Sequence, residues 1–380
     1  MKNFTAYNPV KLHFGKDVTD KIGKSAKRMG KNVLLIYGGG SVVKYGYFDI
    51  IMHRLKQEGL NVVEYAGIKP NPILKNADEA VKLADEQNID LIVALGGGSV
   101  IDTAKYVAVA VPEKLKVWDI VKGKSKPTKA LPIISVLTLA ATGTEMNPFA
   151  VIQNQETKEK LGYGSELMYP KESFSDPQFT YSVPKNQTTY GIVDLIAHSL
   201  ENFFGAGDSP LTDRFTVSII KEAMEYAPKL LSEPENYEYR ANVMFQATTA
   251  LNGMTAWGKS GGDWGVHGIG HTLSALYDTA HGASLSVAYL AWFKHFKEKQ
   301  PERFQKLSSL LFGMKNVDEM IQKFQEFFKK IEAPICMADI DIDGSKKEEI
   351  IELMKDTMVN GMNFKMDVSD YEAIIDLMYS

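Results

Sequence analysis

The first half of the chain alternates short apolar, β-branched segments with amphipathic helical patterns. Strands are predicted at residues 32–37, 61–65, 90–95 and 131–137. Between them, the segment 77–87 places Ala77, Ala80 and Ala84 on one helical face. Because parallel strands need a crossover connection that is usually a helix, this order predicts a mostly parallel sheet covered by helices.

The second half has a different pattern, with few convincing strands. Helices are predicted at residues 188–204, 211–231, 238–255, 283–298, 317–331 and 346–360. The dipeptides Asp176-Pro177 and Val183-Pro184 interrupt any element that would join the two halves. We therefore predict an α/β N-terminal domain with a Rossmann-like sheet over residues 1–185 and an all-α C-terminal domain over residues 186–380.

Charge and cysteine content exclude several classes of protein. The 380 residues carry 47 acidic side chains against 43 lysines and arginines, so no overall positive field exists to attract nucleic acid. No apolar run approaches the ~20 residues that cross a bilayer, and Met1–Thr5 lacks the apolar core of a signal peptide. The one cysteine, Cys336, fits a reducing cytoplasm. We expect a soluble, cytoplasmic protein, with the lysine-rich stretch 114–129 as a solvated loop.

Two of the predicted strands end in the same turn, three glycines and a serine, at residues 38–41 and 96–99. At the carboxyl edge of an open parallel sheet, glycine lets backbone N–H groups approach a phosphate. Ser99 and Asp102 also have N-cap and N3 spacing for a following helix. Neither turn has the G-x-G-x-x-G pattern, because Val43 and Ile101 occupy the third-glycine positions. Tight turns without a ligand therefore remain an alternative to a dinucleotide site.

A third loop follows the strand at 131–137 and contains Thr138, Thr142, Gly143, Thr144 and Glu145. Its hydroxyl groups are suited to hydrogen bonds with a cofactor's phosphate or ribose. A polar turn without a ligand is the competing interpretation.

The most informative residues are an acid and several histidines in the helical half. Asp194 and His198 are four residues apart, so one helical face presents both to a single cation. His267 and His271 have the same spacing, and His281 follows. One carboxylate and three imidazoles suit Zn²⁺ or Fe²⁺. His271 is left over, and we expect it beside the nicotinamide, in a proton path, or in simple helix packing.

In these motifs the sequence resembles the iron-containing, or group III, alcohol dehydrogenases, in particular the butanol dehydrogenase and NADPH-dependent aldehyde reductase branch. The shared motifs occur in the family's order over about three quarters of the chain. They include Phe14-Gly15, the glycine turns, Pro70-Asn71-Pro72, Asp102 with Lys105, Thr142–Glu145, Asp176-Pro177, Gly191 with Asp194, His198 and Glu201, and the two later histidine segments.

The resemblance implies a dehydroquinate synthase-like architecture and a set of site residues. The metal ligands would be Asp194, His198, His267 and His281, and the candidate catalytic residues are His271 and Asp102. The cofactor would contact Gly38, Gly39, Ser41, Asn71, Gly97, Gly98, Ser99, Asp102, Thr138, Thr142, Asn147 and Lys160. Of these, Lys160 is the weakest assignment, because an exposed lysine needs no functional explanation. Relatives form dimers in which the N-terminal strand crosses between subunits, so a homodimer is expected by analogy.

Two departures from the family pattern bear on the cofactor and its loop. NAD-preferring relatives often carry an aspartate just after the first strand, whereas this chain has neutral Gly39, and an acid there would repel a 2′-phosphate. We therefore expect NADP(H) to be preferred over NAD(H). Val100 and Ile101 stand where many relatives have proline after the second glycine turn.

The expected reaction is hydride transfer between NADPH and small aldehydes such as butanal, with a divalent metal polarising the carbonyl. The alternatives are a polyol dehydrogenase and a metal- and NAD-dependent lyase of the dehydroquinate synthase-like superfamily. A metallohydrolase or a non-catalytic sensor is also compatible with the metal pattern, but a hydrolase leaves both glycine turns unexplained.

Overall fold

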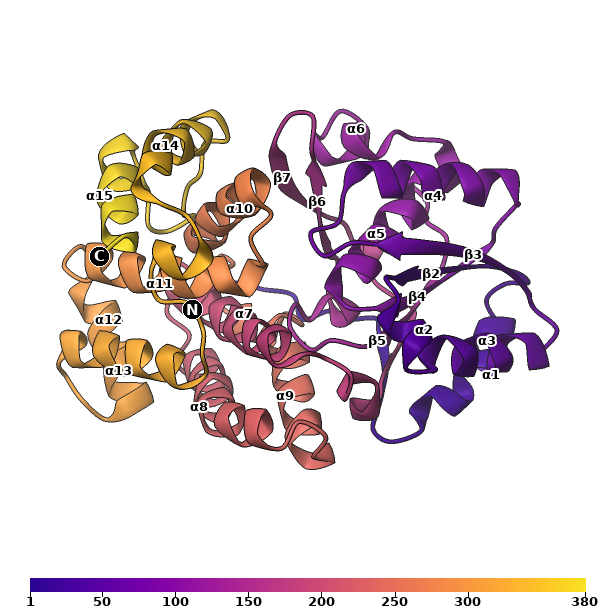
Figure 1. The fold of residues 1–380 in the computed structure, drawn as a ribbon, viewed down its shortest axis with the longest axis horizontal. Helices are drawn as coiled ribbons and strands as arrows, with labels where there is room; N and C mark the ends of the chain where they lie inside the picture. Colours follow the sequence, from indigo (N-terminus) through magenta and orange to yellow (C-terminus); the bar gives the residue numbers. More distant parts are fainter. The chain divides into compact units, whose positions relative to one another are not determined.

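The computed structural model describes residues 1–380, which form two compact units (Figure 1). The α/β unit comprises residues 8–184 and 235–248, and the helical unit comprises residues 1–7, 185–234 and 249–380. The predicted boundary between residues 185 and 186 lies one residue after the end of the α/β unit at residue 184, and two further stretches differ. Residues 1–7 belong to the helical unit, and residues 235–248 belong to the α/β unit.

The α/β unit is built on a six-stranded, all-parallel sheet with the strand order β1-β8-β5-β4-β2-β3. Its strands are β1 Lys11–Phe14, β2 Asn32–Gly38, β3 Asn61–Ile68, β4 Leu91–Gly96, β5 Ile133–Leu137 and β8 Glu172–Ser175. The four strands predicted from the sequence are confirmed. The strands β1 and β8 were not predicted, because four residues are too few to establish a period-two pattern.

Alternating side chains of the strands face two layers of helices. Val33 and Leu35 of β2 pack with α1 Ile22–Lys27 and α3 Tyr47–Gln57. Leu34 and Ile36 of the same strand pack with α4 Leu74–Glu86 and α5 Gly98–Ala110. Both faces of the sheet are therefore buried, as is usual for parallel sheets, and this explains why β2 and β4 are continuously apolar.

Four further elements complete the α/β unit: α2 Ser41–Lys44, α6 Val117–Val121, and the antiparallel hairpin of β6 Phe149–Asn154 and β7 Glu159–Gly164. The helix α6 corrects one expectation, because residues 114–129 were predicted to be a solvated loop. Val117, Ile120 and Val121 are buried against α5, so part of this lysine-rich stretch belongs to the core. The helix α9 Tyr237–Ala250 contributes Met244 to the core on the α5 side of the sheet.

The helical unit surrounds α11, whose residues 282–293 are all buried. Its helices are α7 Lys185–Phe204, α8 Pro210–Ser232, α10 Gly265–Tyr277, α11 His281–Phe296, α12 Pro301–Phe312, α13 Val317–Lys330, α14 Lys347–Asp356 and α15 Val368–Met378. Trp292 of α11 contacts the rings of Phe204, Phe304 and Phe364. No helix is both long and apolar enough to span a bilayer.

Short 3₁₀ helices connect the main elements. They are η1 Val18–Lys21, η2 Val111–Glu113, η3 Thr144–Met146, η4 Glu166–Met168, η5 Pro177–Thr180, η6 Met254–Ala256, η7 Met337–Ile340 and η8 Gly344–Lys346. The segment that follows η6 leads directly into α10, which carries His267 and His271.

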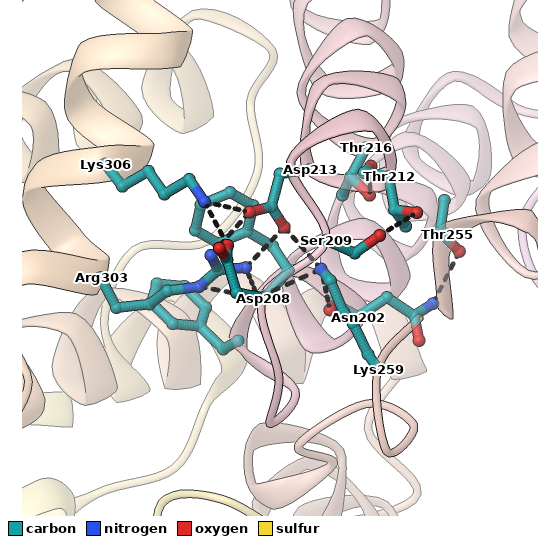
Figure 2. Close-up of polar contacts among 12 residues, drawn as sticks. Asn202, Asp208, Ser209, Thr212, Asp213, Thr216, Thr255, Lys259, Arg303 and Lys306 are labelled. Carbon is teal, nitrogen blue, oxygen red and sulfur yellow. Dashed lines mark hydrogen bonds and ion pairs between the residues drawn. The ribbon is translucent and has the colours of Figure 1, made fainter. Parts of the chain in front are cut away.

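A buried ion network fixes this segment to its neighbours in the helical unit (Figure 2). The fully buried carboxylate of Asp213 on α8 lies 2.7 Å from the ammonium of Lys259 and accepts hydrogen bonds from Arg303 of α12. Lys306 of the same helix lies 2.7 Å from the other carboxylate oxygen. Because the buried carboxylate of Asp213 is surrounded by three cations, its negative charge is well compensated.

Candidate functional site

The helical unit brings the predicted metal ligands together around one carboxylate oxygen. The Oδ1 atom of Asp194 lies 3.6 Å from Nε2 of His198, 3.7 Å from Nε2 of His267 and 3.8 Å from Nε2 of His281. Asp194 and His198 come from α7, His267 from α10 and His281 from the first residue of α11. Three separate helices therefore converge on one point.

Close approach between α7 and α11 depends on Gly282. A Cβ atom at this position would lie 2.1 Å from the carbonyl oxygen of Tyr190, so only glycine lets the first turn of α11 reach α7. This contact carries the neighbouring His281 toward Asp194.

The geometry and chemistry of this cluster fit a divalent cation. Ligand atoms of Asp194, His267 and His281 all lie within 4.8 Å of one another, whereas His198 is placed by the 3.6 Å between its Nε2 and Asp194 Oδ1. Nitrogen and oxygen atoms at about 2.0–2.2 Å from one tetrahedral ion would be about 3.4 Å apart, close to the spacing observed here. The Nε2 atom of His267 is buried and makes no hydrogen bond. A buried nitrogen without a partner is costly, and a cation would satisfy it.

Burial and neighbouring charge shift the pKa values of two of these histidines in opposite directions. Burial lowers the pKa of His198 to about 4, which outweighs the effect of Asp194. Burial also disfavours the charged form of His267, but its interactions with the carboxylates of Asp194 and Glu201 outweigh burial and raise its pKa to about 9. The first shift favours the neutral imidazole that binds a metal. The raised pKa of His267 reflects the negative charge of Asp194 and Glu201, which a bound cation would neutralise.

His271 lies next to the cluster without belonging to it. Its ring centroid is 6.4 Å from that of His267 and 5.3 Å from that of His281. The one-turn offset along α10 thus places a fifth polar side chain beside the four candidate ligands, as the sequence spacing predicted.

In the α/β unit, the second glycine turn is tightly packed. A Cβ atom at Gly96 would lie 2.4 Å from Val100, and one at Gly98 would lie 2.8 Å from both Cγ2 and Oγ1 of Thr142. The N–H of Thr138 donates to the carbonyl of Gly96 at 3.0 Å. The structure therefore brings together Gly97, Gly98, Thr138 and Thr142, with Ser99 following in the first turn of α5.

The first glycine turn is open instead. A Cβ atom at Gly38 would lie 3.6 Å from Val100, the residue that also crowds Gly96, so the two turns are neighbours. A Cβ atom at Gly39 or Gly40 would meet no heavy atom within 4 Å, and Gly39, Gly40 and Ser41 are exposed. Internal packing does not require glycine at residues 39 and 40, which is the arrangement expected where backbone is left accessible to a ligand.

Two predicted cofactor residues have their polar atoms engaged within the fold. The two carboxylate oxygens of Asp102 accept hydrogen bonds from Thr144 Oγ1 at 2.6 Å and from the N–H of Val151 at 2.9 Å. Asn147 accepts from the N–H of Phe149 and donates to the carbonyl of Gly143. Burial raises the pKa of Asp102, and Lys105 and Thr144 oppose this effect. The cofactor and catalytic roles of Asp102 remain predictions.

Lys160 differs from its sequence-based description as an exposed lysine. It is 7% exposed, and its ammonium donates to Oδ1 of Asn71 at 2.8 Å. Two predicted cofactor contacts therefore touch each other, although they are far apart in the sequence.

Two buried charged residues beside the predicted site residues were not assigned a role from the sequence. Lys105 donates to Thr144 Oγ1 at 2.6 Å and to the carbonyls of Asn147 and Phe149, and burial lowers its pKa to about 8. Glu201 of α7 contacts His267 across 2.9 Å. Both residues occur in the motifs shared with the family. A single sequence, however, gives no signal for contacts between residues that lie 39 or more positions apart, as these do.

Comparison with known proteins shows the family to which the chain belongs. The family model for iron-containing alcohol dehydrogenase matches residues 9–177, and the model for the C-terminal domain of the Fe-containing alcohol dehydrogenase family matches residues 188–379. The chain belongs to the iron-containing alcohol dehydrogenase family. It is thus an oxidoreductase of the alcohol dehydrogenase class.

Individual relatives match the chain over 97–100% of its length. A probable NADH-dependent butanol dehydrogenase 1 of Bacillus subtilis is 41% identical over 100% of this chain and 99% of its own length. The NADPH-dependent aldehyde reductase YqhD of Escherichia coli is 33% identical over 97% of both chains. The crystal structure of an NADH-dependent butanol dehydrogenase A from Thermotoga maritima superimposes with a TM-score of 0.96 at 38% identity, covering 100% and 99% of the two chains.

Proposed function

We propose that this chain is a metal-dependent alcohol dehydrogenase that reduces small straight-chain aldehydes such as butanal with NADPH. The observation that carries the proposal is the convergence of three imidazole Nε2 atoms within 3.6–3.8 Å of one buried carboxylate oxygen. The two neighbouring glycine turns of the α/β unit support the binding of a nucleotide cofactor, and family membership supports the class of reaction.

The residues that would hold the metal are Asp194, His198, His267 and His281, with Fe²⁺ or Zn²⁺ as the proposed ion. When bound, such a cation acts as a Lewis acid that polarises a carbonyl oxygen and stabilises negative charge on it. Asp194, His198 and His267 are each at most 5% exposed. Their burial keeps bulk water away from the charge and strengthens its interaction with a polar substrate group.

We assign the proton transfer to His271. Its ring is adjacent to those of His267 and His281, and it is not one of the four proposed ligands. Reduction of an aldehyde leaves a negatively charged oxygen that must take up a proton. An imidazole is suited to this step near neutral pH, directly or through a water molecule.

The preference for NADPH rests on the first glycine turn. Gly39 supplies no negative charge, and the space around it is open. An acid at this position would repel the 2′-phosphate of NADPH. The relatives described above include both NADH-dependent and NADPH-dependent enzymes, so the preference of this chain needs direct measurement.

We also propose a cytoplasmic homodimer. The strand β1 lies at the edge of the sheet and pairs on one side with β8. Its other edge offers backbone groups for pairing with a second copy of the chain. Light scattering on the purified protein gives the oligomeric state.

The experiment that tests the proposed function measures oxidation of NADPH and NADH with a series of straight-chain aldehydes. We expect one NADPH oxidised for each butanal reduced, with a lower rate for NADH. A lyase that regenerates its cofactor would consume no net NADPH, and a sensor would bind NADPH without turnover on any aldehyde. Either result would overturn the proposal.

A further inference from the structure

Glu201 makes three contacts with a short segment of the helical unit. Its Oε1 atom accepts a hydrogen bond from the backbone N–H of His267 at 3.0 Å and lies 2.9 Å from Nδ1 of the same residue. Its Oε2 atom accepts from the N–H of Trp264 at 2.5 Å. Glu201 is 1% exposed, so all three contacts are shielded from bulk water.

These contacts place a carboxylate at the start of α10, where a helix leaves its first N–H groups unpaired. Trp264 is the N-cap residue, with φ of 68°, and its side chain makes no capping hydrogen bond. Instead, the carboxylate of Glu201 caps the helix by accepting hydrogen bonds from the backbone N–H groups of residues 264 and 267. The negative charge also faces the positive end of the helix dipole.

The segment before α10 is joined to the same turn of α7. The N–H of Asp263 donates to the carbonyl of Glu201 at 3.0 Å, and the ammonium of Lys259 donates to the carbonyl of Asn202 at 2.7 Å. Figure 2 shows Lys259 between Asn202 and the carboxylate of Asp213. The helix that carries Asp194 and His198 therefore also fixes the entry of the helix that carries His267.

We propose that Glu201 is a positioning residue of the metal centre. It accepts a hydrogen bond from the N–H at Nδ1 of His267, which leaves the lone pair on Nε2 directed toward Asp194 Oδ1, 3.7 Å away. A carboxylate that holds the far nitrogen of a metal-bound imidazole fixes its tautomer and increases its basicity. The inference rests on the proposed function, because it assigns a role to Glu201 only if the cluster binds a metal.

Only a carboxylate satisfies this set of donors. Both oxygens of Glu201 face N–H groups, with two donors at Oε1 and one at Oε2. A glutamine has one oxygen and one NH₂ group, so one end would place donor against donor. With the NH₂ group toward His267, the imidazole would have to accept at Nδ1 and carry its proton on Nε2, where it cannot bind a cation.

The test compares wild type, Glu201→Gln, Glu201→Asp and Lys306→Met. Co²⁺ affinity of the metal-stripped proteins is measured by competition with a chelator, the visible spectrum is recorded at saturating Co²⁺, and thermal unfolding is followed without metal. We expect Glu201→Gln to weaken Co²⁺ binding by about 10–100-fold. We also expect its ligand-field bands to shift, since His267 is no longer held in one orientation.

Lys306→Met is the matched control. Lys306 belongs to the ion network of Figure 2, where its ammonium pairs with Asp208 and Asp213 rather than with a candidate ligand, so its loss should lower the unfolding temperature. Its Co²⁺ affinity and spectrum should equal those of wild type. This separates loss of stability from loss of positioning.

Glu201→Asp keeps the charge but withdraws the carboxylate by one methylene, and it decides the question if Glu201→Gln does not fold. Weaker Co²⁺ binding with shifted bands supports the proposal. The proposal is overturned if a folded Glu201 variant binds Co²⁺ within about threefold of the wild-type affinity. Loss of a carboxylate that holds a metal-bound imidazole usually has a much larger effect. If the wild-type chain binds no Co²⁺, the proposed function fails as well, whereas tight binding by both wild type and variants removes only the role of Glu201.

Discussion

Oδ1 of Asp194 and Nε2 of His198 lie 3.6 Å apart on one face of α7, one helical turn from each other. Asp194 is also the only carboxylate in the group of ligand atoms that includes His267 and His281. The cluster therefore offers one carboxylate oxygen and imidazole nitrogens as candidate ligands, a combination that suits a divalent ion such as Fe²⁺ or Zn²⁺.

The first prediction concerns cofactor choice. A side chain added at Gly39 meets no heavy atom within 4 Å of its Cβ, so the fold should accept aspartate there. If residue 39 lies beside the 2′-phosphate as proposed, the added charge should raise the KM for NADPH by roughly tenfold or more, because that phosphate carries nearly two negative charges, and should leave NADH oxidation unchanged or improved. Steady-state kinetics with both cofactors measure the effect. Equal effects on the two cofactors would show that residue 39 does not approach the 2′-phosphate.

The second prediction concerns the second glycine turn. In Gly98→Ala the new Cβ would lie 2.8 Å from two atoms of Thr142, and overpacking of this kind costs about 1–3 kcal/mol. We expect a lower free energy of unfolding and weaker NADPH binding. Adding Thr142→Ala removes both close atoms and should restore the stability. A single Gly98→Ala variant as stable as wild type would contradict the packing described here.

The sequence predicted the fold where a hydrophobic pattern repeats over several turns or along a whole strand. The buried strands β2 and β4 and the long helices α7, α8 and α13 all have such patterns, and they are confirmed. The short strands β1 and β8 and the helix α6 do not. The formation of β1 and β8 depends on partners that are distant in the chain, such as Glu172 beside Lys11 in the sheet register, and the apolar residues of α6 are interspersed in a lysine-rich stretch.

The candidate site follows the same rule. Asp194 with His198 could be found from helical spacing, His267 and His281 were added from the two later histidine segments, and the family resemblance implied the same four ligands. Glu201 and His267 are 66 residues apart, and nothing in the spacing of the chain links them. Lys160 was described as exposed because its neighbours Lys158 and Glu159 are charged, yet strand β7 turns its side chain toward Asn71.

The third prediction concerns His271. Its replacement by alanine should lower turnover with butanal by about 100-fold or more, as for other groups that transfer a proton in the reaction. The metal content should not change, because His271 is not one of the four proposed ligands and its ring centroid lies 6.4 Å from that of His267. Turnover and elemental analysis on the same sample check both statements. Unchanged turnover would assign His271 to helix packing only.

The fourth prediction concerns acid stability. The hydrogen bonds and charges of Arg303 and Lys259 hold the pKa of Asp213 well below its usual range, despite the opposing effect of burial. A depressed carboxylate pKa contributes stability above the unfolded-state value of about 3.9 and loses it as the pH falls further. Asp213→Asn should therefore cost about 3–5 kcal/mol at pH 7, because three cations lose their buried anion.

Urea unfolding of Asp213→Asn and wild type from pH 7 to pH 3 gives the measurement. The difference between the two proteins should stay constant down to about pH 4 and then shrink. A difference that already declines between about pH 7 and pH 5 would mean that the carboxylate of Asp213 is not held by the cations in Figure 2.

The most direct test of the metal-dependent mechanism is removal and return of the ion. The purified chain is stripped with a chelator, assayed for butanal-dependent NADPH oxidation, and reloaded with Fe²⁺ or Zn²⁺, with Asp194→Asn as the control. We predict about one metal ion per chain, activity that is lost on stripping and restored on reloading, and neither bound metal nor activity in Asp194→Asn. Full activity in the stripped wild-type protein would contradict the account.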